Sequence, residues 1–260
     1  MPSSPRDLIL SVFALYARER DNWLSVSSVI AMLEALDVDA AATRSSISRL
    51  KKRGVLEPER RAESAGYRLS AATLAALTEG DRRIWRGRPD ETTEWLVVMF
   101  SVPEAERDKR HALRSHLTRL GFGNAAAGVW VAPAGLYDET LAVLDRAGLA
   151  AYTEFFRGDY LGVGSESSRV AQWWDLDEIA AAYRSFLADL GGPDPTDPAE
   201  AFAAYVPMLT EWRRLPYLDP GLPAGLLPQD WPGGEAHERF ARMDSSLQPL
   251  AATHAATLLR

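Results

Sequence analysis

The chain has 260 residues, a formal net charge of −7 at pH 7, 47% hydrophobic residues, 25% charged residues and no cysteine. This composition is typical of a folded globular protein with two or three small units, and it excludes a disulfide framework or a thiolate metal site. No stretch reaches 18 uninterrupted apolar residues and the first 20 residues lack the pattern of an export signal, so we expect no membrane span and a cytoplasmic location.

Charge is unevenly distributed along the chain. Residues 1–89 contain 15 Lys and Arg against 11 Asp and Glu, a balance of +4. Residues 90–260 contain 14 against 25, a balance of −11. A basic segment joined to an acidic remainder is typical of a polyanion-binding module, although an excess of four charges is a modest signal.

Three helices are predicted in the first 53 residues. The first covers residues 6–19, and its apolar stripe consists of Leu8, Val12, Leu15 and Tyr16. The second follows a Ser25 N-cap, and its stripe consists of Val26, Val29, Ile30 and Leu33. The third runs from Ala40 to about Arg53, with Asp39 as N-cap and Gly54 as the left-handed residue that ends it.

Two short strands are predicted next, at residues 55–59 and 66–70, joined by a polar turn. Ser70 then caps a further helix through the 70s and 80s. Three helices followed by a two-stranded ribbon predict a winged-helix domain over residues 1–89.

The third helix is predicted to have a polar, basic outer face. Its inward stripe, at spacings of three and four, is Thr43, Ser46, Ile47 and Leu50. Its outward positions supply the donors that phosphates and major-groove base edges accept: Arg44, Ser45, Ser48, Arg49, Lys51 and Lys52. Arg60 and Arg61, at the tip of the ribbon, are expected to reach neighbouring phosphates. We therefore predict a DNA recognition helix; the alternative is a solvated helix whose basic end complements the helix dipole.

A different pattern begins at Glu94. Residues 95–102 are a β-rich run, and a charged helix follows over residues 103–120. Next come a short strand from about 120, a strand at 128–133, an amphipathic helix at 137–148 and a last strand within 149–162. The order β-α-β-β-α-β predicts a ferredoxin-like domain over residues 90–168.

The remaining residues, 169–260, are predicted to form a helical domain. Five prolines between Pro216 and Pro232 exclude regular helix there, so residues 216–234 are expected to form an extended strap before a last helix near 235–258. The fold class predicted for the whole chain is α+β.

Cationic side chains on the charged helix of the middle domain are candidates for a ligand site. The helix is expected to bury Leu113, Leu117 and Leu120, and to leave on or beside its exposed side Arg107, Arg110, His111, Arg114 and Arg119. Surface pairs such as Glu106 with Arg110 are the simpler explanation, and contacts to the phosphates of a CoA-type ligand are the alternative. His111 and His116 point to different helix faces, so no metal site is predicted.

Aromatic residues in the last third of the chain are candidates for an acyl pocket, although core packing is the simpler explanation. They are Trp173, Trp174, Trp212 and Trp231. The effector-binding set we take forward consists of Arg107, Arg110, Arg114, Trp173 and Trp212. No Ser-His-Asp order, Gly-rich phosphate loop or paired-carboxylate motif stands out, so neither catalysis nor a cofactor is predicted.

Four stretches together resemble the PaaX family of bacterial transcriptional repressors of aromatic-acid catabolism, and the resemblance covers nearly the whole chain. They are TRSSISRLKKRGVL (43–56), VVMFSVPEAERDKRHALRSHLTRLGFGNAAAGVWVAP (97–133), WWDLDEIAAAYRSFL (173–187) and PYLDPGLPAGLLPQDWPG (216–233). The second and fourth stretches are the most specific.

The resemblance implies a winged helix, a middle domain similar to the Cas2 nuclease fold and a helical C-terminal region. It also implies a homodimer on a palindromic DNA operator, released by an acyl-CoA thioester such as phenylacetyl-CoA. Nucleases of the Cas2 type have a metal-binding Asp at the end of the first strand, whereas Phe100 and Ser101 occupy that region here. Two other functions remain open: a nucleic-acid-processing enzyme built on the middle domain, and an adaptor that uses the winged helix for protein contact.

Overall fold

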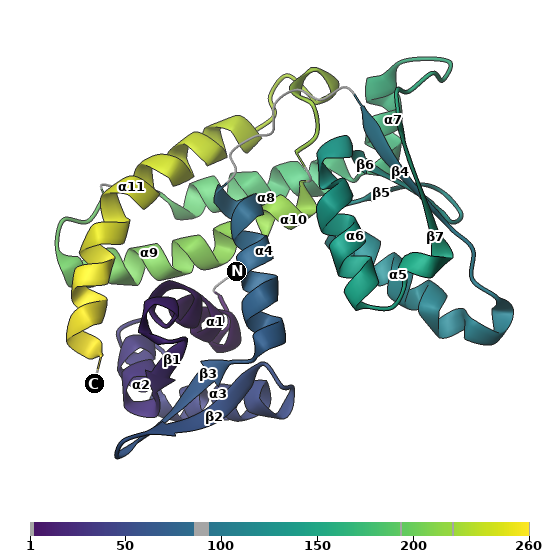
Figure 1. Ribbon diagram of the computed structural model, residues 1–260. Helices are drawn as coiled ribbons and strands as arrows, with labels where there is room; N and C mark the ends of the chain where they lie inside the picture. Colours follow the sequence, from purple (N-terminus) through teal and green to yellow (C-terminus); the bar gives the residue numbers. More distant parts are fainter. Residues whose placement is uncertain (1–2, 86–93, 193, 220, 260) are drawn as a thin grey trace. The chain divides into compact units, whose positions relative to one another are not determined.

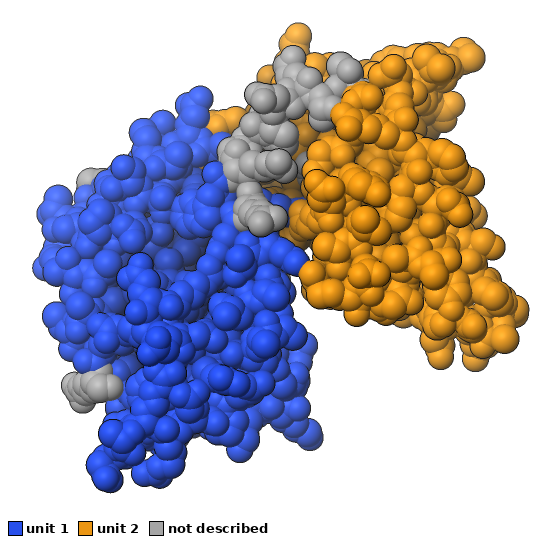
Figure 2. All heavy atoms as spheres, in the orientation of Figure 1, with its two compact units in different colours: residues 1–85, 186–213, 237–260 blue, residues 86–185, 214–236 orange. Residues whose placement is uncertain are grey.

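The computed structural model describes residues 3–85, 94–192, 194–219 and 221–259, which form a mixed α and β structure. These residues pack into two compact units (Figure 2). Unit 1 contains residues 1–85, 186–213 and 237–260, and unit 2 contains residues 86–185 and 214–236. The predicted helical segment 169–260 therefore contributes to both units.

The predicted domain boundaries remain predictions. The boundary at 89/90 lies outside the described residues, and the one at 168/169 falls within a helix, α7.

Unit 1 begins with helices and a small antiparallel sheet (Figure 1). Its first elements are α1 (Pro5–Tyr16), η1 (Arg18–Arg20), β1 (Trp23–Ser25), α2 (Val26–Glu34), α3 (Ala40–Lys52), β2 (Leu56–Arg61), β3 (Ser64–Leu69) and α4 (Ala71–Trp85). The sheet has the order β1-β3-β2. Strand β1 was not predicted, and β2 and β3 are longer than predicted because only Ala62 and Glu63 separate them.

The buried faces of α1 and α2 are broader than the predicted stripes. On α1, Ile9 and Phe13 are fully buried, whereas Leu15 and Tyr16 are half-buried. On α2, Met32 is fully buried, whereas Val26 and Ile30 are half-buried. The reason is that α1 packs against α2, α3 and α9 together, and a helix with several neighbours buries more than one narrow stripe.

Helices from the C-terminal part complete unit 1. They are the end of α8 (Leu176–Asp189), α9 (Pro198–Trp212) and most of α11 (Gly233–Leu258). Helix α9 packs on α1, where the Ser11 and Thr210 hydroxyls hydrogen-bond at 2.7 Å and the Tyr16 and Phe202 rings stack with centroids 5.9 Å apart. The N-terminal helices thus share their core with a segment about 200 positions later in the sequence.

Unit 2 contains a four-stranded antiparallel sheet with two helices on one face (Figure 1). Its elements are β4 (Trp95–Phe100), η2 (Glu104–Glu106), α5 (Arg107–Arg119), β5 (Gly123–Ala126), β6 (Val129–Pro133), η3 (Ala134–Leu136), α6 (Tyr137–Arg146), η4 (Ala150–Tyr152), β7 (Thr153–Gly158), α7 (Glu166–Trp173), the start of α8, α10 (Leu215–Leu218) and η5 (Ala224–Leu226). The strand order is β5-β6-β4-β7. The predicted β-α-β-β-α-β order is confirmed.

The core of unit 2 lies between this sheet and its two helices. Leu96 and Val98 of β4 pack with Leu113 and Leu117 of α5 and with Leu144 of α6, all 2% exposed or less. One prediction about this unit was wrong: residues 216–234 are not a purely extended strap, because they include most of α10 and all of η5. Proline is tolerated in the first turn of α10, where its missing N–H would have had no helical partner. Within the described part of the chain, no helix has both the length and the apolarity needed to cross a bilayer.

Candidate nucleic-acid interface

Helix α3 presents one buried face and one exposed basic face. Thr43, Ser46, Ile47 and Leu50 are all buried. Six side chains on the other face are exposed: Arg44, Ser45, Ser48, Arg49, Lys51 and Lys52. The predicted division of this helix into an inward and an outward face is confirmed.

Both ends of α3 are fixed by local hydrogen bonds. The Asp39 carboxylate accepts from Ala42 N–H at 2.8 Å, which satisfies one of the unpaired donors of the first turn. At the other end Gly54 takes φ 68, its N–H donates to Lys51 O, and Val55 N–H donates to Leu50 O, both at 3.0 Å. This pair of bonds is a Schellman motif, and it turns the chain from α3 directly into β2.

The charge of the exposed α3 face is not neutralised by ion pairs within the described part of the chain. Residues 40–56 contain five cationic and no acidic side chains. Among the described residues none of the five, Arg44, Arg49, Lys51, Lys52 and Arg53, forms an ion pair. Arg49 instead lies along the helix, with its guanidinium donating to Ser45 Oγ at 3.2 Å and to Ser45 O at 3.4 Å. The face therefore presents an array of charged donors beside small hydroxyl groups.

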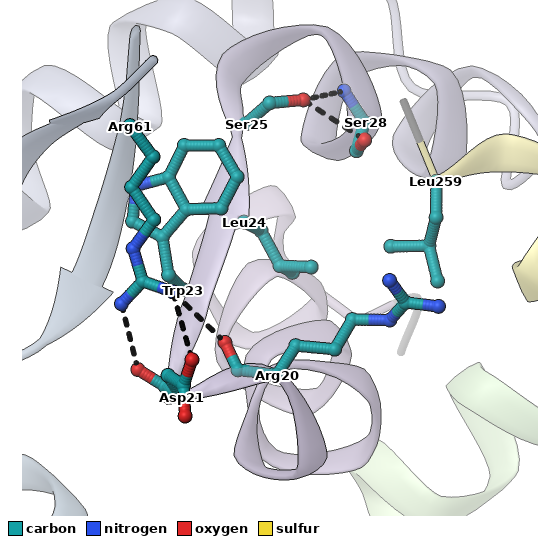
Figure 3. A pocket seen from close by; sticks show the side chains of 8 residues that line it. All are labelled: Arg20, Asp21, Trp23, Leu24, Ser25, Ser28, Arg61 and Leu259. Carbon is teal, nitrogen blue, oxygen red and sulfur yellow. Dashed lines mark hydrogen bonds and ion pairs between the residues drawn. The ribbon is translucent and has the colours of Figure 1, made fainter. Parts of the chain in front are cut away.

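The two arginines of the ribbon differ in what they contact. Arg60 is exposed, and its guanidinium makes one long bond, to Glu63 O at 3.3 Å. The guanidinium of Arg61 lies 5.2 Å from the Trp23 ring centroid and donates to Glu59 Oε1 at 2.6 Å. It also donates to the backbone oxygen of Asp21 at 3.1 Å and pairs with the Asp21 carboxylate at 3.5 Å (Figure 3). Arg61 is thus a structural contact between the ribbon and the turn before β1, and both arginines belong to strand β2 rather than to the turn.

A cavity of about 350 Å³ lies next to this contact (Figure 3). It is lined by Arg20, Asp21, Trp23, Leu24, Ser25, Ser28, Arg61 and Leu259. Sequence reasoning missed Trp23, which closes one side of the cavity and whose Nε1 donates to Glu59 O at 3.1 Å. The contact joins residues 36 positions apart, and no local pattern in the sequence signals it.

The candidate effector cations on α5 fall into two groups. Arg107 and Arg114 are exposed and, among the described residues, have no hydrogen-bond or ion-pair partner. Arg110 donates to Val102 O at 2.9 Å and pairs with Glu104 at 3.3 Å. The predicted Glu106–Arg110 pair is wrong: Glu106 pairs with Lys109 at 2.7 Å and accepts from Tyr152, because the short η2 segment places Glu106 outside the regular helix. These hydrogen bonds, first that of Lys109, lower the pKa of Glu106.

The candidate tryptophans belong to different compact units. In unit 2, Trp173 is half-buried and contacts the rings of Trp95 and Tyr160, with centroids 5.7 Å away in each case. In unit 1, Trp212 is only 1% exposed and stacks on Phe240 at 4.4 Å. Trp174 and Trp231 are in unit 2, where the Trp174 Nε1 donates to Gly121 O and Trp231 meets Tyr183 edge-on. Trp212 is a core residue, which agrees with the packing explanation for it.

Metal chemistry has no candidate cluster in the part of the chain that the structure describes. No three His, Asp or Glu side chains lie together there in a way that could hold an ion. Strand β4 ends at Phe100, and Ser101 after it is exposed.

Three family models match successive parts of this chain. Residues 4–73 match the model for PaaX-like protein, residues 88–170 match the PaaX protein central Cas2-like domain, and residues 174–257 match the PaaX-like protein C-terminal domain. The matches fall in the same order along the chain as the three predicted segments.

Two whole-length comparisons agree with these matches. The transcriptional repressor PaaX of Escherichia coli strain K12 is 25% identical over 263 residues, which cover 96% of this chain and 83% of the repressor. Among solved structures, the uncharacterized protein Rv0674 from Mycobacterium tuberculosis aligns with a TM-score of 0.60 at 23% identity, covering 95% of this chain and 96% of that one. At this identity the structural likeness shows the fold alone.

Proposed function

Since this chain belongs to the PaaX family of transcriptional repressors, we propose that it represses transcription by inserting α3 into the major groove of an operator. In this proposal the N-terminal elements, α1 to α3 with the β2–β3 ribbon, act as a winged helix. The observation that carries the proposal is the exposed α3 face, whose five cations form no ion pair with any described residue. A charged face without internal partners suits a polyanion, because binding releases the counterions of the DNA.

Different residues are assigned to bases and to phosphates. Arg44 and Arg49, with Ser45 and Ser48 between them, face outward on the middle of α3, where a recognition helix meets base edges. Lys51 and Lys52 at its C-terminal end, and Arg60 on the ribbon, are assigned to phosphates. Arg61 is assigned to holding the ribbon, since its donors are already used by Glu59 and Asp21.

The repressor is proposed to act as a homodimer on a palindromic operator, with one α3 in each of two successive major grooves. Its release is proposed to follow binding of an acyl-CoA thioester, which must favour a dimer geometry that no longer matches the half-site spacing. Of the effector contacts predicted from sequence, Arg107, Arg114 and Trp173 have side chains available, whereas Arg110 is paired and Trp212 is buried. A non-enzymatic role in the cytoplasm, where the chromosome is, completes the proposal.

The test is operator binding by purified protein, measured by mobility shift on the DNA upstream of its own gene at several salt concentrations. Arg49→Ala is expected to weaken binding by about 1–3 kcal/mol, roughly 5- to 150-fold, without a change in the far-UV spectrum, because the side chain faces solvent. Arg6→Ala, another exposed arginine in unit 1, is the control and is expected to bind like the wild type.

Three results would contradict the proposal. Binding of Arg49→Ala within twofold of wild type would remove Arg49 from the contact set. Absence of any salt-sensitive, sequence-preferring complex would favour a protein-interaction adaptor. Specific cleavage of labelled DNA or RNA with magnesium or manganese, lost on substitution of an acidic residue of unit 2, would favour a nuclease.

A further inference from the structure

Helix α5 of unit 2 has an exposed stripe of guanidinium, imidazole and hydroxyl side chains that the recognition helix does not account for. The stripe consists of Arg107, His111, Arg114 and Thr118, all exposed, at spacings of four, three and four residues. These spacings place the four side chains on one line along the helix. Leu113 and Leu117, both 0% exposed, occupy the opposite side in the core of unit 2.

The nitrogen-bearing side chains of this stripe are available to an outside partner. Among the described residues, Arg107, His111 and Arg114 have neither an ion pair nor a hydrogen-bond partner. The neighbouring cations Lys109 and Arg110 are, by contrast, held by Glu106 and Glu104. Pairing within the protein was the simpler explanation for a charged helix. It accounts for Lys109 and Arg110 but not for the stripe.

The stripe also lies in a basic segment of an otherwise acidic part of the chain. Residues 107–119 contain five of the 14 Lys and Arg in residues 90–260, with a single acidic residue, Asp108. The same segment 90–260 has a balance of −11 and would repel a polyanion over most of its surface. Helix α5 is therefore a local concentration of positive charge in this part of the chain.

We propose that the α5 stripe is a second DNA-contact surface, which binds the phosphate backbone of the duplex beside the operator. This inference rests on the proposed function, because α3 is what brings the duplex to the protein. Seven residues of α-helix separate Arg107 from Arg114, a rise of about 10.5 Å. Long, flexible arginine side chains at this separation can each reach a different phosphate of one strand.

Shape and chemistry favour a backbone over the phosphates of a small effector. The stripe lies on the convex outer side of a helix and carries charge over two turns, whereas small-molecule sites are concave and largely apolar. Its donors are guanidinium, imidazole and hydroxyl groups, which read phosphates without selecting a base sequence. The surface would therefore add affinity and salt dependence, and not specificity.

The experiment compares Arg107→Gln/Arg114→Gln with wild type on operator duplexes whose flanks increase in steps from zero to 20 base pairs. Glutamine keeps helix propensity and removes the charge. The control, Arg157→Gln/Arg184→Gln, removes the same charge from unit 2 at exposed positions that have internal partners, Glu94 and Asp230. Dissociation constants are measured at 50 to 200 mM salt, together with the phenylacetyl-CoA concentration that releases the operator.

Two lost phosphate contacts are expected to reduce the slope of log K against log salt by about 1.8 once the flank reaches the stripe. Wild-type affinity then falls about 12-fold more than that of the variant between 50 and 200 mM salt. The control pair is expected to keep the wild-type slope on every duplex.

An unchanged slope on all flank lengths overturns the proposal. So does a variant that needs more phenylacetyl-CoA for release at an unchanged slope, because the stripe then serves the effector. If Arg49→Ala loses the operator while the α5 variant matches wild type, the α5 proposal alone fails. If wild type has no preference for its operator, the proposed function fails, and the same slope measured on unrelated duplex still decides whether α5 binds a backbone.

Discussion

The Trp23 indole packs directly on the backbone of Gly66. A Cβ atom on Gly66 would lie 2.4 Å from Cε2 and Cζ2 of Trp23 and 2.5 Å from Leu24 O, closer than atoms can approach. The same indole donates from Nε1 to Glu59 O on the neighbouring strand. One side chain thus joins the three-residue strand β1 to both strands of the ribbon.

Gly66→Ala is therefore expected to destabilise unit 1 by about 1–3 kcal/mol, because either the indole or the strand must shift. Urea unfolding measures the loss, and the ribbon shift should also weaken operator binding. Gly135→Ala is the control, since a Cβ there would meet nothing within 4 Å. Equal free energies of unfolding for the two variants would show that the Trp23 contact can rearrange without loss of stability.

The N-cap of α3 gives a second prediction. Asp39→Ala is expected to cost about 1 kcal/mol, because Ala42 N–H loses its acceptor, whereas Asp39→Asn should cost little since asparagine caps equally well. Thermal unfolding followed by circular dichroism distinguishes them. A loss as large for Asp39→Asn as for Asp39→Ala would point to the charge of Asp39, and not to the cap, as the stabilising feature.

Helix α3 was predictable because its signals are local. Asp39, Gly54 and the three- and four-residue spacing of Thr43, Ile47 and Leu50 all lie within 16 positions, and each acts through the backbone of its own helix. The strand and helix order of unit 2 was predictable for the same reason. Its hydrophobic pattern switches between the strand period and the helix period at turn residues. The order of elements along the chain, however, does not indicate which distant residues contact one another.

The features that were not predicted depend on contacts between residues far apart in the sequence. Strand β1 is too short to have a period, and it is a strand only because β3 pairs with it 41 positions later at Ser25 and Gly66, among other pairs. Arg61 was expected to face a phosphate, but its guanidinium donates to the backbone oxygen of Asp21, 40 positions earlier. No pattern near Arg61 in the sequence predicts this contact. The candidate effector residue Trp212 is buried by Phe240 of α11, a helix that follows a proline-rich segment.

Trp212 provides a third prediction, which separates packing from ligand contact. Trp212→Phe keeps a ring on Phe240 and loses the Nε1 bond to Ile84 O, 3.3 Å long in the wild type. An unpaired buried carbonyl costs about 1–3 kcal/mol, so the variant should unfold at lower urea with an unchanged effector response. Trp85→Phe, at a site 47% exposed, is the stability control. A changed effector response without a loss of stability would place Trp212 in a ligand site after all.

The Tyr205–Asp244 hydrogen bond between α9 and α11, in which Asp244 is half-buried, is expected to make the stability of unit 1 depend on pH. The Tyr205 hydroxyl, on a residue 1% exposed, donates to Asp244 Oδ1 at 2.6 Å. Burial raises the pKa of Asp244 above its usual 3.8, and the hydrogen bond from Tyr205 opposes part of that rise. The folded protein therefore holds this proton more tightly than the unfolded chain does. Its contribution to stability is complete below pH 3.8 and is lost as pH rises through the raised pKa.

Asp244→Asn removes this titration while its side-chain oxygen can still accept from Tyr205. The free energy of unfolding of wild type, minus that of Asp244→Asn, is expected to be larger at pH 3.5 than at pH 7, as measured by urea unfolding across that range. Tyr205→Phe removes the hydrogen bond that lowers the pKa of Asp244. In this variant, the stabilisation from protonated Asp244 should therefore be lost over a higher pH range than in wild type. A wild-type minus Asp244→Asn difference that is constant with pH, or larger at pH 7, would mean that Asp244 is solvated well enough to ionise at no cost, and the α9–α11 contact would then be looser than the packing of Tyr205 implies.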